Sequence, residues 1–202
     1  MHFTNRSFSK SIAFGVIFLL TSFVINFYAG MWATENASNY VKDIILSNIP
    51  VFDVDFIFLY GPLFLWVFVA FLAGHKPQKI PFILKSIALF IIIRSVFITL
   101  THIGPFPDQI QISTTSWLTK FTFGGDLFFS AHTGLPFLMA LAFWKNKILR
   151  IIFTTTAIFF GMIVLLGHLH YTIDVVSAFF ITYTIFHMAQ KLFKNDWQVF
   201  NS

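Results

Sequence analysis

Six long apolar runs constrain this chain more than any other feature of its sequence. A segment needs about 20 apolar residues to cross a bilayer as a helix, and only helices or closed barrels satisfy their backbone polar groups there. The runs lack the period-2 alternation of barrel strands, so we predict helices. The predicted spans are approximately 8–31, 54–73, 80–100, 127–144, 148–167 and 171–193.

The composition agrees with a membrane-embedded chain. Hydrophobic residues make up 57% of the 202 residues and charged residues only 10%, whereas a soluble domain has about 25% charged residues. This excludes a disordered chain and argues against a soluble nucleic-acid-binding protein. We therefore expect an all-α, polytopic membrane protein in which residues 1–202 form one domain, a bundle of six transmembrane helices.

The basic residues predict an orientation for this bundle. Ten of the 13 Lys and Arg residues fall on the side that carries both termini, and Lys42 and Lys120 fall on the opposite side. This is the positive-inside pattern, so we expect both termini in the cytoplasm. A signal peptide is the alternative for the first run, but that run is long for one and no clear cleavage site follows.

Four ionisable residues lie within or at the ends of the predicted spans: Arg94, His132, His170 and Asp174. Such residues are costly in a membrane and are usually functional. Three different spans bring them to the outer third of the bilayer. We therefore predict a polar site that faces the non-cytoplasmic side, in an integral protein of a bacterial inner (plasma) membrane.

The spacing of His170 and Asp174 predicts that they contact each other on one helix face, four residues apart. A carboxylate bonded to one imidazole nitrogen fixes the tautomer and leaves the other nitrogen free as a base or nucleophile. A buried ion pair that only ties helices together is the alternative.

His132 and Arg94 also have a structural and a functional interpretation. Ser130 can cap the helix that His132 enters, and a helix N-terminus favours phosphate, but His132 can also be simply interfacial. The Arg94 guanidinium suits a phosphate, or it can extend to the interface. His168 and His170 point to different helix faces and lack a clear third ligand, so we expect no metal and no other cofactor.

Three strings resemble a known family. Residues 167–176 (GHLHYTIDVV) and 125–133 (GDLFFSAHT) are similar to the last two motifs of sphingomyelin-synthase-like proteins, a branch of the type 2 phosphatidic acid phosphatase (PAP2) superfamily. The string that begins at Arg94, with Pro105 and Pro107 beyond it, resembles the Arg-bearing third span of that branch. Ala131 replaces the usual Gly. The motif-bearing part covers about residues 80–190.

The resemblance implies catalytic roles for three residues. His170 is the implied nucleophile that forms a phosphohistidine-type intermediate, Asp174 orients it, and His132 transfers protons. We assign substrate binding to a second set of residues. That set is Arg94, Asp126, Ser130, His168 and Tyr171.

The chain departs from the wider superfamily in its cations. Lys85 and Arg94 are nine residues apart rather than seven, and Val164 stands where the third motif of the superfamily has a second Arg. Fewer cations favour a phosphodiester, which carries less charge than a phosphomonoester. We therefore expect a phospholipid head-group phosphotransferase or phospholipase C-like hydrolase, with a lipid hydroxyl or water as the acceptor. The alternatives are a lipid phosphate phosphatase and a non-enzymatic scaffold or transporter.

Overall fold

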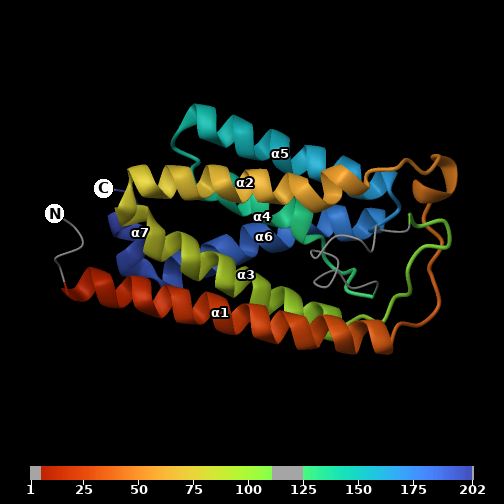
Figure 1. The fold of residues 1–202 in the computed structure, drawn as a ribbon, viewed down its shortest axis with the longest axis horizontal. Coiled ribbons are helices and arrows are strands. Elements are labelled where there is room, and N and C mark those ends of the chain that lie inside the picture. Colours follow the sequence, from red (N-terminus) through yellow and green to blue (C-terminus); the bar gives the residue numbers. More distant parts are fainter. Residues whose placement is uncertain (1–5, 111–124, 202) are drawn as a thin grey trace.

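The computed structural model describes residues 6–110 and 125–201, and the secondary structure of this part is entirely helical (Figure 1). Two short 3-10 helices, η2 (Leu46–Asn48) and η3 (Pro77–Lys79), accompany the α-helices. The α-helices are α1 (Arg6–Glu35), α2 (Asp55–His75), α3 (Ile80–Leu100), α4 (Ala131–Ala142), α5 (Lys147–Leu166), α6 (Thr172–Leu192) and α7 (Lys194–Phe200).

The long helices run back and forth along one direction, so the bundle has two distinct ends (Figure 1). The start of α1 and the whole of α7 lie at one end, which we call the terminal end. The segments 36–54 and 101–110 lie at the other, which we call the loop end. Both described ends of the chain are thus at the same end of the bundle.

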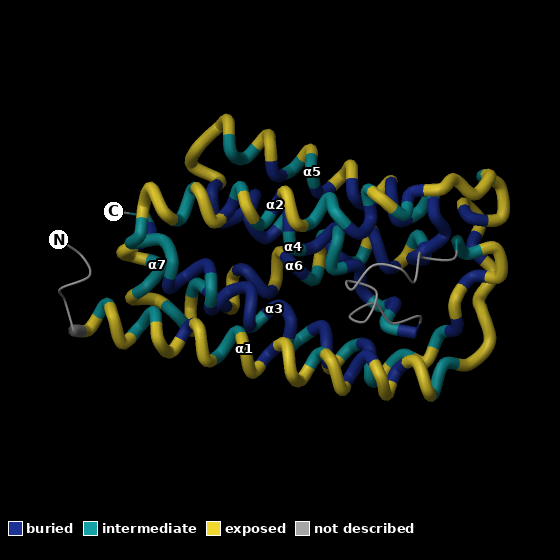
Figure 2. The backbone as a smooth tube through the Cα atoms, in the orientation of Figure 1, coloured by how far each residue is buried: buried dark blue, intermediate teal, exposed yellow. Residues whose placement is uncertain are grey.

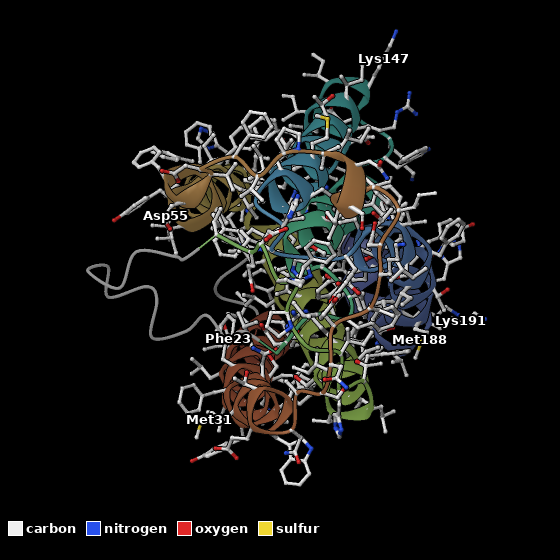
Figure 3. The ribbon with its side chains drawn as sticks, turned by 90° about the vertical axis from the view of Figure 1, so that its right-hand side faces the viewer. Phe23, Met31, Asp55, Lys147, Met188 and Lys191 are labelled. Atoms are coloured by element: carbon white, nitrogen blue, oxygen red, sulfur yellow. The ribbon has the colours of Figure 1, made fainter. Side chains whose placement is uncertain are left out.

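Five helices are long and apolar enough to cross a membrane: α1, α2, α5, α6 and the segment that contains α3. Over half of the α3 window is buried, 56%, compared with 17% for α1, so α3 is central and α1 is peripheral. Exposed residues recur along α1, α2 and α5 on the outside of the bundle (Figure 2). Phe23, Met31 and Met188 are examples of apolar side chains that project outward (Figure 3), as expected for contact with lipid.

The fourth predicted helix is much shorter than the sequence indicated. We predicted a span over 127–144, but α4 contains only 12 residues and is about 18 Å long at 1.5 Å per residue. Residues 125–130 are not helical, although Leu127, Phe129 and Ser130 are buried. Apolar composition alone could not distinguish this buried, non-helical segment from the first turns of a helix.

Close packing holds α4 in the middle of the bundle. It contacts α5 and α6 extensively and α3 to a lesser extent. A Cβ atom at Gly134 would lie 2.6 Å from the Phe90 ring of α3 and 2.8 Å from the Thr182 hydroxyl of α6. Glycine at this position therefore permits the close approach of these three helices, which brings His132 near the loop end of the bundle.

Candidate active site

Arg94 binds the non-helical segment that precedes α4. Its Nε donates to the carbonyl of Phe129 at 2.8 Å, and its terminal nitrogens donate to the carbonyl and the carboxylate of Asp126, the latter at 3.3 Å. Non-helical backbone at membrane depth must have its carbonyls satisfied by the protein. Arg94 supplies hydrogen-bond donors to two of these carbonyls. Its guanidinium therefore holds the segment in place rather than facing an open cavity.

The contact between His170 and Asp174 is present, but its geometry is not the predicted one. Nδ1 of His170 lies 3.4 Å from Oδ2 of Asp174, and both side chains are buried. However, α6 begins only at Thr172, so His170 lies before the helix and the pair does not share a helix face. The loop instead folds His170 back toward the first turn of α6.

The Asp174 carboxylate also fixes the start of α6. Its Oδ2 accepts a hydrogen bond from the backbone N–H of Tyr171 at 2.9 Å, which satisfies one of the free N–H groups of the first turn. Its Oδ1 is buried and has no hydrogen-bond partner in the described structure. Because His170 uses Nδ1 toward Asp174, its Nε2 is the nitrogen that remains available.

His132 lies on the first turn of α4 against α2. Its Nε2 is 3.2 Å from the carbonyl of Phe58, and its ring stacks on the Phe58 ring at 4.2 Å between centroids. With a proton on Nε2, the other nitrogen, Nδ1, carries the lone pair. His132 also lines a small groove of about 70 Å³ between α2, α4 and α5, together with Trp66 and Phe160.

The structure brings several of the predicted site residues close together at the loop end. His170 lies near enough to Asp126 and to His132 for an electrostatic interaction with each of them. The backbone N–H of Ser130 donates to the carbonyl of Asp174 at 3.2 Å. This bond connects the two motif segments directly.

Two predicted substrate-binding residues have their polar groups engaged within the protein. Ser130 is at the N-cap position of α4, but its side chain makes no capping hydrogen bond, contrary to our prediction. Its hydroxyl instead accepts a hydrogen bond from the Thr133 hydroxyl at 3.4 Å. The Tyr171 hydroxyl donates to the carbonyl of Gly104 at 2.8 Å and accepts from the N–H of Val41 at 3.2 Å. Tyr171 thereby joins both loops of the loop end to the start of α6.

His168 lies apart from these contacts, in a cavity between the loops. It is buried, and neither ring nitrogen has a hydrogen-bond partner among residues 6–110 and 125–201. Its ring meets Phe106 edge-on, with centroids 5.2 Å apart. The cavity has a volume of about 600 Å³ and is lined further by Lys42 and Asp108. The described side chains contain no group of three His, Asp or Glu residues arranged to hold a metal ion.

Asp43 contributes to the loop end of the bundle, although the sequence does not single it out. Its carboxylate accepts from the N–H of Thr172 at 2.7 Å and from the Thr172 hydroxyl at 2.9 Å, and also from the N–H groups of Ile45 and Leu46. Burial alone would raise the pKa of Asp43, but these hydrogen bonds outweigh it and lower the pKa. Asp43 thus fastens the 36–54 loop to the start of α6. Nothing in the sequence around position 43 indicates this long-range partner.

Two loops cover the loop end of the bundle, and the structure describes them over residues 36–54 and 101–110. The described parts of both loops pack over the start of α6 through Tyr171 and Asp43. Lys120, which was assigned to the outer side, lies outside the described residues.

Comparison with known proteins identifies the region that carries the site. Residues 124–191, about a third of the chain, match the family model described as PAP2 superfamily C-terminal. No curated protein and no solved structure matches the chain. The matched region contains His132, His170 and Asp174. The part of the chain that carries these three residues is therefore similar to the C-terminal part of the PAP2 superfamily.

Proposed function

We propose that this chain is an integral membrane enzyme that transfers a phosphoryl group of a lipid through His170. The observation that carries the proposal is the contact of His170 Nδ1 with the buried Asp174 carboxylate at 3.4 Å. This contact orients the imidazole, stabilises its cationic form and leaves Nε2 as the nucleophile. The match of residues 124–191 to the PAP2 superfamily supports a lipid phosphatase or phosphotransferase.

The proposed reaction has two steps. Nε2 of His170 attacks the phosphorus, the ester oxygen of the lipid leaves, and His132 gives that oxygen a proton. Water or a lipid hydroxyl, deprotonated by His132, then attacks the phosphohistidine and releases His170. Since Nε2 of His132 already faces the Phe58 carbonyl, we assign the proton transfer to Nδ1. Nδ1 is protonated before the first step, gives this proton to the leaving oxygen, and regains one from water or the lipid hydroxyl in the second step.

The charges of the site support a phosphodiester as the substrate. Arg94 is paired with Asp126 at 3.3 Å and is therefore neutralised by the protein. Of the other described basic residues, Lys42 lies at the loop end, where it lines the separate cavity that contains His168. A phosphodiester brings one negative charge and a phosphomonoester nearly two. We therefore favour cleavage or transfer of a phospholipid head group, the reaction of the sphingomyelin-synthase-like branch.

A lipid phosphate phosphatase is the second candidate, and the family match itself favours it, since phosphatidic acid phosphatases define the superfamily. Purified protein in detergent or proteoliposomes should be offered phosphatidylcholine, phosphatidylethanolamine and phosphatidic acid, with and without ceramide or diacylglycerol. We expect products from the two phosphodiesters, identified by mass, and little phosphate from phosphatidic acid. Rapid phosphate release from phosphatidic acid alone would instead establish the phosphatase.

We further propose that the loop end faces the non-cytoplasmic side of a bacterial plasma membrane. The excess of Lys and Arg near the terminal end supports this orientation. The chain has no cysteine, so a single one can report its position. Asp108→Cys should react with a membrane-impermeant maleimide in intact cells, whereas Gln198→Cys in α7 should react only after permeabilisation. The reverse labelling pattern would invert the orientation.

A further inference from the structure

Three lysines converge on one cavity at the terminal end of the bundle, far from His170. The cavity has a volume of about 430 Å³ and lies between the ends of α2 and α4, the starts of η3 and α5, and the end of α7. We call it the lysine pocket. Its polar lining residues are His75, Lys76, Gln78, Lys79, Lys145, Asn146 and Asn201.

No acidic side chain is among the described residues that line the lysine pocket. Lys76 and Lys145 are near enough for their charges to repel the Lys79 ammonium. Lys79 Nζ donates to the carbonyl of Phe200 at 2.6 Å and lies 3.8 Å from the centre of the Phe200 ring. These contacts hold the ammonium in place, but they do not neutralise it. Three positive charges thus surround one cavity without a carboxylate in its described lining.

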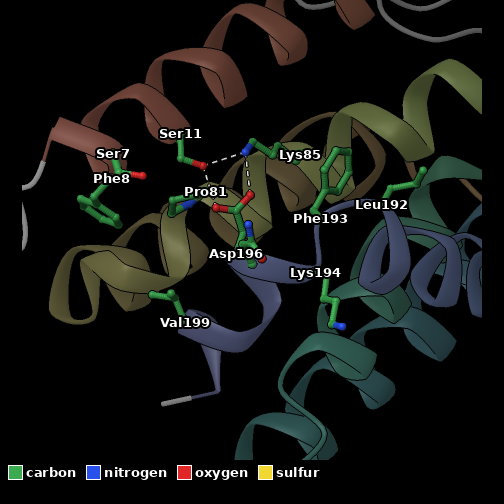
Figure 4. Close-up of a pocket in the computed structure, with 11 residues that line it drawn as sticks. Ser7, Phe8, Ser11, Pro81, Lys85, Leu192, Phe193, Lys194, Asp196 and Val199 are labelled. Carbon is green, nitrogen blue, oxygen red and sulfur yellow. Dashed lines mark hydrogen bonds and ion pairs between the residues drawn. The ribbon is translucent and has the colours of Figure 1, made fainter.

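A neighbouring cavity at the same end shows how this protein neutralises a buried lysine. That cavity has a volume of about 620 Å³ and contains Lys85, whose Nζ lies 2.6 Å from Asp196 and 2.7 Å from the Ser11 hydroxyl (Figure 4). The Ser11 hydroxyl donates to the other oxygen of Asp196 at 2.6 Å. This network is closed and its charges cancel, so it leaves no comparable attraction for an anion.

The other lining residues of the lysine pocket indicate the kind of anion. The amides of Gln78, Asn146 and Asn201 can donate hydrogen bonds to phosphate oxygens. The apolar lining consists of Leu72, Ala142, Phe143, Ile148, Leu149 and Phe200. The pocket thus combines cations with apolar surface at the end of membrane-length helices, where lipid head groups lie.

We propose that the lysine pocket binds the phosphate of an anionic phospholipid from the leaflet at the terminal end. The phosphate would accept hydrogen bonds from Lys76, Lys79 and Lys145, and the glycerol and upper acyl chains would lie on the apolar lining. Soluble phosphate shares the same anionic chemistry and is distinguished by the test below. The proposal does not depend on the proposed reaction, because the pocket lies at the opposite end of the bundle from His170.

Two double variants separate this pocket from general surface charge. Lys76→Gln with Lys145→Gln removes two charges from the pocket and leaves Lys79 in contact with Phe200. Lys147→Gln with Lys191→Gln removes two charges as well, from exposed side chains that project away from the bundle and do not line the pocket (Figure 3). The midpoint of thermal unfolding, Tm, is measured in neutral detergent with dioctanoyl phosphatidylglycerol, dioctanoyl phosphatidylcholine or inorganic phosphate.

We expect phosphatidylglycerol to raise the Tm of the unmodified protein and of the Lys147/Lys191 variant by several degrees. Phosphatidylcholine should have a much smaller effect, and the Lys76/Lys145 variant should lose most of the phosphatidylglycerol shift. An equal Tm shift with inorganic phosphate would show that the lysine pocket binds an anion and would assign soluble phosphate as its ligand. The proposal is overturned if both double variants respond alike, or if phosphatidylglycerol shifts no Tm.

Discussion

Replacing His170 with Ala should abolish turnover of the lipid substrate and leave the fold intact. The loss of a nucleophile that acts together with its partners costs roughly 10⁴-fold or more in kcat. His170 lies outside α6, and its one described hydrogen-bonding contact is with Asp174, so truncation removes little that stabilises the bundle. The measurement is the initial rate of product formation, together with the Tm of the same preparation.

Asp174→Asn tests the same mechanism with a smaller structural change. An amide keeps the size of the side chain but cannot stabilise the His170 imidazolium, so we expect a large loss of kcat with little change in KM. The matched control is His187→Ala, which truncates an exposed histidine of α6 whose ring contacts the Tyr183 ring at a tilt. Full activity in His170→Ala, or equal losses in His170→Ala and His187→Ala, would refute the assigned nucleophile.

Arg94→Met should destabilise the whole protein. The loss of a residue that only binds substrate would not have this effect. The variant leaves the carboxylate of Asp126 and the carbonyls of Asp126 and Phe129 without their donor. Removing one partner of a buried pair costs about 3–5 kcal/mol, which is a large part of the stability of a typical domain. We expect a markedly lower Tm in detergent and loss of activity.

Arg94→Lys separates the charge of Arg94 from its geometry. Lysine keeps the positive charge, but a single ammonium cannot reproduce the planar fork that reaches both Asp126 and Phe129. We expect an intermediate Tm and a large loss of kcat, because the segment before His132 is no longer held. Arg150→Met is the control, since Arg150 stacks on Trp144 at the terminal end. If Arg94→Met changes the Tm no more than Arg150→Met does, Arg94 does not hold the segment.

Much of the fold could be predicted because membrane-spanning helices are determined by local composition. The predicted runs at 80–100, 148–167 and 171–193 agree with α3, α5 and α6 to within two residues. The run at 127–144 was wrong in its first part. The buried residues at the start of this run can remain non-helical because a side chain from elsewhere satisfies their backbone carbonyls. That side chain is Arg94 of α3, which donates to the Phe129 carbonyl. No local pattern carries that information.

The contacts among the candidate site residues were predicted only in part. The proximity of His170 and Asp174 follows from their spacing and was confirmed. Their placement on one helix face was wrong, because α6 begins only at Thr172 and His170 lies before it. Arg94 was expected to bind substrate, but its hydrogen bonds go to Asp126 and Phe129. Asp43 was missed because its partner Thr172 is 129 residues away in the chain.

The sequence by itself therefore determined the membrane class of this protein, most of its helices and the polar residues that must lie together. These follow from hydrophobicity, local spacing and the high cost of charge in a bilayer, all of which act over short stretches of chain. Only the tertiary structure decided which charges are neutralised. Lys85 and Lys79 both belong to the basic residues near the terminal end. Lys85 forms an ion pair with Asp196, whereas Lys79 lines a pocket without a described carboxylate. Electrostatic pairing depends on distances between helices, and the sequence does not contain those distances.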